Sequence, residues 1–205
     1  MTRQRREIIA LICFVLFAML TGLVWFGYAN VFDVQLHDWA LGIYPVGSEN
    51  IWKFVTSFGS GLMIATLLAV SLGILVHLKR WDDFKYLIFV MTAAGATEIS
   101  MKWLIHRPRP TEIFENTLPN SYSFPSGHTI YGTTFYLAIA FIAAPKKSGN
   151  TQRAIWLAAG LAGLLIGASR IFLGVHYFSD VMGGYLVALF WLVQPWSFPK
   201  KELSF

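Results

Sequence analysis

Charged residues are scarce in this sequence, and their scarcity excludes a water-soluble protein. Asp, Glu, Lys and Arg make up 13% of the 205 residues, against about 25% in ordinary globular domains. Hydrophobic residues make up 56% and the mean hydropathy is +0.55, so the chain has too little polar surface to cover a soluble particle. The 17 Phe, 8 Trp and 8 Tyr exclude a disordered chain as well.

Cysteine and concentrated positive charge are also lacking. The single cysteine, Cys13, lies in an apolar run, which excludes a disulfide scaffold. The net charge is +5, but no compact stretch combines basic residues with polar neighbours as in nucleic-acid-binding proteins. The composition therefore predicts an integral membrane protein without a nucleic-acid partner.

Six apolar stretches divide the chain. A transmembrane helix requires about 20 predominantly apolar residues, and the stretches that reach or approach this length are Ile8–Ala29, Phe54–Leu78, Tyr86–Ile105, Thr129–Ala144, Ala154–Leu173 and Phe178–Val193. The fourth and sixth have only about 16 residues, so we expect their ends to extend into the flanking sequence. Because no repeat or linker is visible, the sequence predicts one all-α domain over residues 1–205, a six-span transmembrane helical bundle.

A secretory signal peptide is the alternative interpretation of the first stretch, because Arg3, Arg5 and Arg6 precede it. Its apolar run of about 22 residues is longer than the roughly 7–15 residues of a signal-peptide core. The length favours a first membrane span.

The positions of the basic residues predict the orientation in the membrane. Eleven of the 16 lie in alternate segments between the spans, namely Arg3, Arg5, Arg6, Lys79, Arg80, Lys85, Lys146, Lys147, Arg153, Lys200 and Lys201. Cytoplasmic loops are enriched in Lys and Arg, so we expect this side, with both termini, in the cytoplasm. The five exceptions are Lys53, Lys102, Arg107, Arg109 and Arg170.

Four of these five exceptions lie near the outer ends of the third and fifth spans, beside other polar residues. The histidines His128 and His176 and the carboxylate Asp180 flank the fourth and sixth spans on the same side. Taken singly, a lysine or arginine is explained as an interfacial anchor, a Pro-Ser-Gly-His segment as a capped turn, and a histidine near a helix end as an interfacial side chain. Their coincidence on one membrane face favours a functional site.

Phosphoryl transfer is the chemistry that suits this cluster. The three cations Lys102, Arg109 and Arg170 would neutralise phosphate oxygens. The segment Ser126–His128 at a helix start would offer backbone N–H groups, with Gly127 allowing an anion to approach closely.

Two histidines and a carboxylate complete the set. His176 and Asp180 are four residues apart, so on a helix they would share one face and touch. The carboxylate would fix the imidazole tautomer and leave the other ring nitrogen as a nucleophile, while His128 would protonate the leaving oxygen.

Metal-dependent hydrolysis is the competing chemistry. Asp180 is the only well-placed carboxylate in a cation-rich cluster, and Glu112 and Glu115 in the nearby loop lack a recognised ligand spacing. We therefore expect no metal ion and no other cofactor.

Three motifs in these residues resemble the signatures of the type 2 phosphatidic acid phosphatase superfamily. They are Lys102 followed after six residues by Arg109-Pro110, then Pro125-Ser126-Gly127-His128, and then Ser169-Arg170 followed by His176 and Asp180. All three occur complete and in order across residues 102–180, and the six-span layout resembles the bacterial membrane members of the family.

The resemblance implies a role for each motif residue. His176 would carry a phosphohistidine intermediate, Asp180 would orient it, and His128 would be the general acid. The phosphate would be bound by Lys102, Arg109, Ser126, Gly127 and Arg170. Ser169 would have a structural role, and the family is metal-independent. Vanadate haloperoxidases share the fold, but the six spans argue against that activity.

The resemblance also implies a lipid phosphatase, active at the outer face of a bacterial plasma membrane. We expect hydrolysis of phosphatidylglycerol phosphate to phosphatidylglycerol, as in the phosphatidylglycerophosphatase members of the family, with undecaprenyl diphosphate as the alternative substrate. A non-catalytic phospholipid transporter is the third hypothesis, but it would not need the histidines. The expected partners are the lipid substrate and the bilayer, with no obligate protein partner.

Three polar residues near the motifs stay unassigned. Glu98 lies four residues before Lys102 on an expected helix, so a structural ion pair between them is plausible. Arg107 is either an interfacial anchor or a ligand for a second phosphate or head group, and His106 has no assigned role.

Overall fold

A computed structural model describes residues 2–43, 48–110 and 121–194 of the chain. All regular structure in these ranges is helical, as the sequence predicts. The helices are α1 (Arg3–Trp25), α2 (Asn30–Gly42), α3 (Glu49–Ser57), α4 (Gly61–His77), α5 (Trp81–Ile105), α6 (Gly127–Ala143), the 3₁₀ helix η1 (Ala144–Lys146), α7 (Gly149–Phe172) and α8 (Phe178–Leu192). The expected basic residues Lys200 and Lys201, and the loop residues Glu112 and Glu115, lie outside the described ranges.

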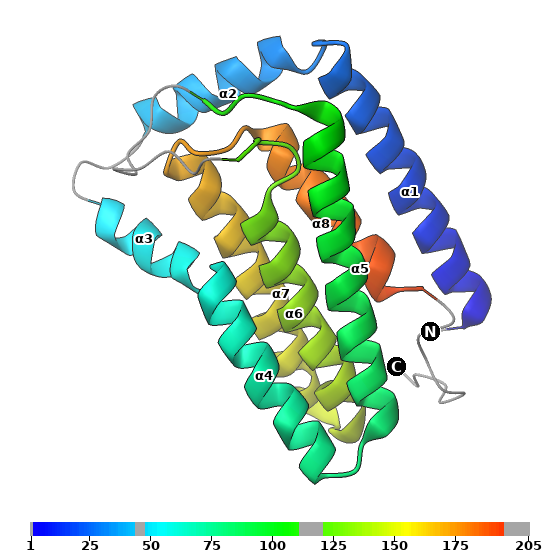
Figure 1. Ribbon diagram of the computed structural model, residues 1–205. Helices are drawn as coiled ribbons and strands as arrows, with labels where there is room; N and C mark the ends of the chain where they lie inside the picture. The colour runs from blue at the N-terminus through cyan, green and yellow to red at the C-terminus, as the bar shows by residue number, and fades with distance from the viewer. Residues whose placement is uncertain (1, 44–47, 111–120, 195–205) are drawn as a thin grey trace.

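The helices run back and forth between two ends of one bundle (Figure 1). At one end, the guanidinium of Arg80 donates to the Ile142 carbonyl at 3.1 Å, and the hydroxyl of Tyr86 donates to the Leu192 carbonyl at 3.2 Å. At the other end α5 and α7 finish, and α6 and α8 begin. We call this second end the motif end, because the three sequence motifs lie there.

Within residues 2–43, 48–110 and 121–194, four segments are long and apolar enough to cross a membrane. They are α1, α3 and α4 taken together, α5 and α7. Helices α6 and α8 have 17 and 15 residues. Large apolar side chains point outward, for example Leu11, Leu62 and Leu157 at 62%, 82% and 66% exposure. A soluble protein rarely exposes so much apolar surface, whereas a bilayer would cover it.

The structure departs from the expected spans in two places. The stretch Phe54–Leu78 is divided between α3 and α4, because the side chain of Ser60 accepts a hydrogen bond from the Met63 N–H at 3.3 Å and caps a new helix. Helix α2 has no counterpart among the expected spans. It is 13 residues long, too short to cross a bilayer, and it lies across the motif end (Figure 1).

Helix α6 is the centre of the bundle and packs against α5, α7 and α8. Small residues allow these helices to approach closely. A Cβ atom on Gly132 would lie 2.8 Å from the Ile166 side chain, and one on Gly163 would lie 3.0 Å from the Thr133 hydroxyl. This packing holds the start of α6 beside the end of α7, which places two of the sequence motifs next to each other.

The contact between α7 and α8 leaves no room for a side chain at Gly167. A Cβ atom there would lie 2.0 Å from the hydroxyl of Tyr185 and 2.9 Å from Val181, so Gly167→Ala must displace the Tyr185 ring, whose hydroxyl donates to the carbonyls of Gly163 and Leu164. We expect a destabilisation of about 1–3 kcal/mol, measured by thermal unfolding in detergent.

The matched control is Gly160→Ala on the same helix. No atom lies within 4 Å of the Cβ position there, and alanine is the better helix former by up to about 1 kcal/mol. Unchanged or raised stability is expected at Gly160. Equal stability of the two variants would contradict the close packing at Gly167.

Candidate functional site

All three sequence motifs meet at the motif end of the bundle. Lys102 lies in the last turn of α5, which His106 terminates with a left-handed backbone (φ 50°). Ser126 is the N-cap residue of α6, and Arg170 lies in the last turn of α7. Each motif therefore includes a helix end, and the bundle packing brings these ends together.

His176 and Asp180 are in contact, although not for the reason that their spacing suggests. Helix α8 begins only at Phe178, so His176 precedes the helix. Asp180 occupies the third helical position and its Oδ2 accepts the Tyr177 N–H at 2.9 Å, the reciprocal arrangement of a capping box. This cap turns the carboxylate back toward the chain before the helix, where Oδ2 lies 3.3 Å from Nδ1 of His176.

The partners of His176 fix its tautomer. Nη1 of Arg109 lies 3.0 Å from Nε2 of His176, and a guanidinium can only donate. Nε2 is therefore the acceptor, and Nδ1 carries the proton that faces Asp180. Burial lowers the pKa of His176 to about 3, against the opposing effect of Asp180. The side chain is a neutral imidazole whose Nε2 lone pair points toward a cation.

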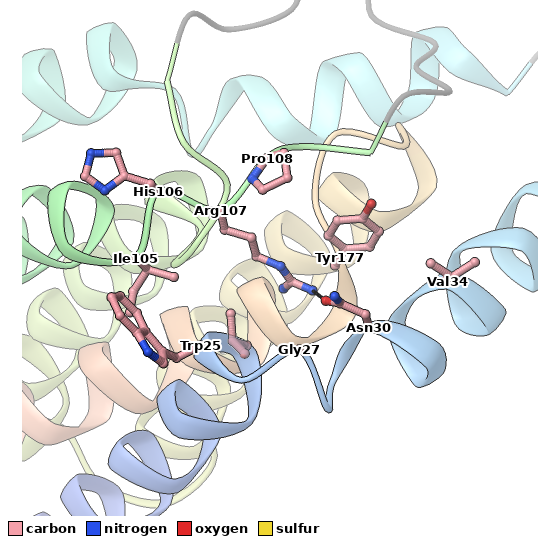
Figure 2. A pocket seen from close by; sticks show the side chains of 10 residues that line it. Trp25, Gly27, Asn30, Val34, Ile105, His106, Arg107, Pro108 and Tyr177 are labelled. Atoms are coloured by element: carbon pink, nitrogen blue, oxygen red, sulfur yellow. Dashed lines mark hydrogen bonds between the residues drawn. The ribbon is translucent and has the colours of Figure 1, made fainter.

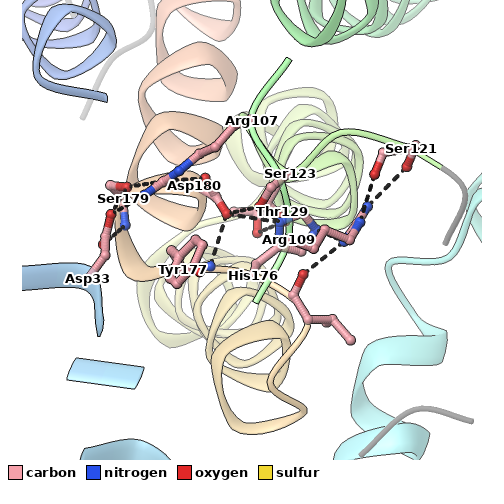
Figure 3. A network of polar contacts seen from close by, with 12 residues as sticks. Asp33, Arg107, Arg109, Ser121, Ser123, Thr129, His176, Tyr177, Ser179 and Asp180 are labelled. Carbon is pink, nitrogen blue, oxygen red and sulfur yellow. Dashed lines mark hydrogen bonds and ion pairs between the residues drawn. The ribbon is translucent and has the colours of Figure 1, made fainter. Parts of the chain in front are cut away.

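Arg109 is held in place by backbone carbonyls. It donates to the Val175 carbonyl at 2.8 Å and to the Ser121 carbonyl at 2.9 Å, and also to the Ser121 hydroxyl at 3.0 Å (Figure 3). The contact with Val175 joins the segment after α5 to the segment before α8. Arg109 therefore links the first sequence motif to the third.

The other two expected phosphate-binding cations lie on the helices that flank α6. Lys102 is in the last turn of α5 and Arg170 is in the last turn of α7, and α6 packs against both helices. Arg170 is only 1% exposed and donates to the Thr56 hydroxyl at 2.7 Å. The structure thus brings the expected cations and both histidines to one place.

Glu98 pairs with Lys102, as the sequence suggested. Oε1 of Glu98 lies 2.9 Å from Nζ of Lys102, and Oε2 accepts the Tyr131 hydroxyl at 3.1 Å. Oε1 also lies against the start of α6, because a Cβ atom on Gly127 would be 2.8 Å from it. The ion pair therefore contacts the Pro-Ser-Gly-His segment directly.

The start of α6 is tied to α8 by one backbone hydrogen bond. The Ser126 N–H donates to the Asp180 carbonyl at 3.0 Å, and the Ser126 hydroxyl accepts that of Thr129 at 3.0 Å. The first N–H groups of a helix have no partner within it. In α6 these are the N–H groups of residues 127–129, because the Ile130 N–H already donates to the Ser126 carbonyl at 3.0 Å.

Several residues at the site were not assigned from the sequence. Arg107 is 6% exposed and turns inward, where Nη1 lies 2.7 Å from Oδ1 of Asp180 and Nη2 lies 2.7 Å from Oδ2 of Asp33 on α2 (Figure 3). It is therefore neither an interfacial anchor nor placed for a second phosphate. Ser123 donates to Oδ2 of Asp180. The sequence signal for Arg107 was that it is one of the five basic residues outside the segments expected in the cytoplasm.

His106 differs from Arg107 in being exposed. Its ring packs edge-on against Tyr122, with 4.4 Å between the centroids. Both His106 and Arg107 line a cavity of about 360 Å³ between α1, α2 and the end of α5. Figure 2 shows Tyr177 and Asn30 on the same wall as Arg107. This cavity lies next to Arg107, which separates it from Asp180.

No group of three or more His, Cys, Asp or Glu side chains within residues 2–43, 48–110 and 121–194 is arranged to hold a metal ion. In that part of the chain, two carboxylates of the motif end already have cationic partners. Asp180 pairs with Arg107, and Glu98 with Lys102.

Fold and site together define a helical membrane protein in which His176 lies between a carboxylate and the Arg109 guanidinium at one end of the bundle. Residues 83–203 match the model of the PAP2 superfamily. The chain belongs to this superfamily, as the three motifs suggested.

Individual relatives agree with this assignment. The chain is 26% identical over 186 residues to phosphatidylglycerophosphatase B of Bacillus subtilis (strain 168), covering 88% of this chain and 91% of that protein. It is 31% identical over 137 residues to the undecaprenyl-diphosphatase of Sulfolobus acidocaldarius, covering 67% of this chain and 53% of the relative.

A solved structure shares the fold. The crystal structure of a transmembrane PAP2 type phosphatidylglycerolphosphate phosphatase from Bacillus subtilis superposes with a TM-score of 0.81. The sequence identity is 24%, and the match covers 89% of this chain and 92% of that one.

The contact between Gly127 and Glu98 generates a prediction. Gly127→Ala would displace the Glu98 carboxylate, which lies 2.8 Å from the Cβ position, and so disturb Lys102. A displacement of about 1 Å can cost up to about 100-fold in rate. We expect a loss of this order in kcat/KM for an aryl phosphate.

Gly61→Ala is the matched control, because Gly61 is also the first residue of a helix and has no atom within 4 Å of its Cβ position. It is expected to retain full activity. If Gly127→Ala retained it as well, the Glu98 carboxylate would not constrain the segment that is expected to bind phosphate.

Proposed function

We propose that this protein is a membrane lipid phosphatase that hydrolyses phosphatidylglycerol phosphate to phosphatidylglycerol through a phosphohistidine intermediate. The observation that supports it best is the orientation of His176. Its Nδ1 faces Asp180 at 3.3 Å and its Nε2 faces Arg109 at 3.0 Å, so a neutral nucleophile points toward a phosphate-binding cation.

In the first step, Nε2 of His176 attacks phosphorus and the bond from phosphorus to the glycerol oxygen breaks. His128 gives its proton to that leaving oxygen. The proton on Nδ1 stays between His176 and Asp180, whose charge stabilises the cationic ring. Lys102, Arg109 and Arg170 offset the charge on the phosphate oxygens, together with Ser126 and the N–H of Gly127.

In the second step, water attacks the phosphohistidine and the phosphorus–nitrogen bond breaks. His128 accepts a proton from that water, which restores its starting state, and inorganic phosphate leaves. Neither step requires a metal ion, because the protein cations supply the positive charge that offsets the phosphate oxygens.

The relatives support phosphatidylglycerol phosphate as the substrate. Two of the matches, one by sequence over 91% of its length and one by structure, are named for this activity. Undecaprenyl diphosphate is the alternative, which the Sulfolobus relative favours. A non-catalytic transporter would need the cations but neither histidine, so the His176–Asp180 contact argues against it.

We further propose a single domain over residues 1–205 with six membrane spans, in which α6 and α8 cross together with the four longer segments. Both termini would face the cytoplasm and the motif end would face outward from a bacterial plasma membrane. The basic residues at the opposite end support this orientation. No obligate protein partner is required, since every proposed catalytic group comes from one chain.

Phosphate release from a lipid panel tests the substrate and the metal-free mechanism together. We expect purified protein in detergent to act fastest on phosphatidylglycerol phosphate, at the same rate with and without EDTA. Faster release from undecaprenyl diphosphate would transfer the assignment to the alternative. Loss of turnover in EDTA, restored by Mg²⁺, would contradict the metal-free mechanism.

The role of His128 predicts a dependence on the leaving group. His128→Ala should lower kcat for the lipid substrate by about 10²–10⁴-fold, the usual contribution of a general acid. The loss should be much smaller for an aryl phosphate, whose leaving group needs little protonation. Equal losses on both substrates would argue that His128 serves binding and not proton transfer.

The topology is tested with single cysteines in a Cys13→Ala background. Asn50 near the motif end and Ser148 near the opposite end are both exposed. An impermeant thiol reagent added to intact cells should label Asn50→Cys and leave Ser148→Cys unlabelled until the cells are broken. The reverse pattern would invert the proposed orientation.

A further inference from the structure

Asp33 is a buried carboxylate from a helix that none of the sequence motifs includes. It is fully buried on α2. Its Oδ1 accepts the Ser179 N–H at 3.0 Å, and its Oδ2 accepts the Ser179 hydroxyl at 2.5 Å and Nη2 of Arg107 at 2.7 Å. Asp33 therefore binds the first turn of α8 and Arg107, a cation that also touches Asp180.

Arg107 connects the two carboxylates. Nη1 donates to Oδ1 of Asp180 and to the Ser179 hydroxyl, both at 2.7 Å, while Nη2 faces Asp33. The guanidinium carbon also lies 4.5 Å from the centre of the Tyr177 ring, a favourable place for a cation. Burial opposes the charge on Arg107, but Asp180 and Asp33 outweigh it and raise the pKa of the side chain. It stays charged.

The two carboxylate oxygens of Asp180 have different partners. Oδ1 faces Arg107. Oδ2 accepts the Tyr177 N–H and the Ser123 hydroxyl and faces Nδ1 of His176. Arg107 thus fixes the carboxylate so that its other oxygen is presented to His176.

The positive charge of Arg107 would cancel the negative charge of Asp180, and Asp33 compensates for it. A pair of Arg107 and Asp180 alone would be neutral, and a neutral pair stabilises a cationic imidazole poorly. With Asp33 included, the three buried side chains carry a net charge of −1. Because charges interact strongly at buried positions, this single net charge matters for a group in contact with Asp180.

We propose that Asp33 and Arg107 are positioning residues for the reaction, with Arg107 holding Asp180 against His176 and Asp33 cancelling the charge that Arg107 brings. The inference rests on the proposed function, in which His176 becomes cationic when it is phosphorylated. Neither residue touches the substrate, so both act on kcat through Asp180 and leave the binding of the phosphate unchanged.

Two variants test the charge balance on an aryl phosphate. Asp33→Asn changes the net charge of the three side chains from −1 to 0 and is expected to lower kcat by about 10- to 100-fold, with KM within about twofold, since the phosphate-binding cations are intact. Adding Arg107→Gln to Asp33→Asn restores the net charge to −1. The double variant should be more active than Asp33→Asn because the charge is restored, but less active than the wild type because Arg107 no longer holds Asp180.

Asp38→Asn is the matched control, because Asp38 is exposed on the same helix. It should retain wild-type kcat and KM. Thermal unfolding of each variant in detergent separates loss of folded protein from loss of rate. The double variant removes both members of the Arg107–Asp33 pair, while Asp180 keeps the Tyr177 N–H, the Ser123 hydroxyl and His176 as partners, so it is expected to fold even if Asp33→Asn does not.

Three results would overturn the inference. They are equal activity of Asp33→Asn and Asp38→Asn, a double variant no more active than Asp33→Asn, and a double variant that is unfolded or reduced more than about 100-fold. A wild-type protein that released no phosphate from any substrate would instead refute the proposed function. The two failures are therefore distinguishable.

Discussion

The buried carboxylate of Asp180 is the group on which the rest of the site depends. It caps α8 through the Tyr177 N–H and contacts His176 through the same oxygen, so the helix start and the imidazole are fixed by one side chain. Its backbone carbonyl accepts the Ser126 N–H and ties α6 to α8. A change at Asp180 would therefore disturb the fold of the motif end as well as the proposed chemistry.

The apolar surroundings explain why this carboxylate needs so many partners. An ionised group near the membrane is costly unless it is paired. Asp180 is fully buried and receives hydrogen bonds from Arg107, Ser123 and the Tyr177 N–H. The same constraint applies to Glu98, which pairs with Lys102. These two carboxylates of the motif end are thus each paired with a cation.

Much of this arrangement follows from local sequence patterns. The apolar runs predicted the helices because a membrane span has a minimum length, and the spacing of Glu98 and Lys102 predicted their ion pair because both lie on one helix. The motifs were expected to meet because each of them lies at an end of an apolar run that faces the same side of the membrane. The cap by Ser60 that divides the second stretch is also a local feature, but a long apolar run conceals it.

Other features depend on contacts that no local pattern reveals. Asp33 and Arg107 are 74 positions apart, and nothing near Asp33 distinguishes it from an ordinary polar residue on a short helix. Only the placement of α2 across the motif end brings the two together. The contact between His176 and Asp180 was predicted from the sequence, but for the wrong structural reason. Their four-residue spacing correctly suggested contact, but the contact arises from a helix cap and not from a shared helical face.

The central claim is that His176 is the nucleophile, and trapping the phosphoenzyme tests it most directly. Rapid acid-free quenching after mixing with ³²P-labelled substrate should leave label on the wild-type protein that is stable to base and lost in acid, as a phosphoramidate requires. Phosphate bound without a covalent bond is removed by denaturing gel filtration. We predict that His176→Ala gives no label, while His128→Ala, which retains the nucleophile, can still be labelled from an aryl phosphate. Label at the wild-type level in His176→Ala would contradict the account, because phosphorus would then be bonded to another residue.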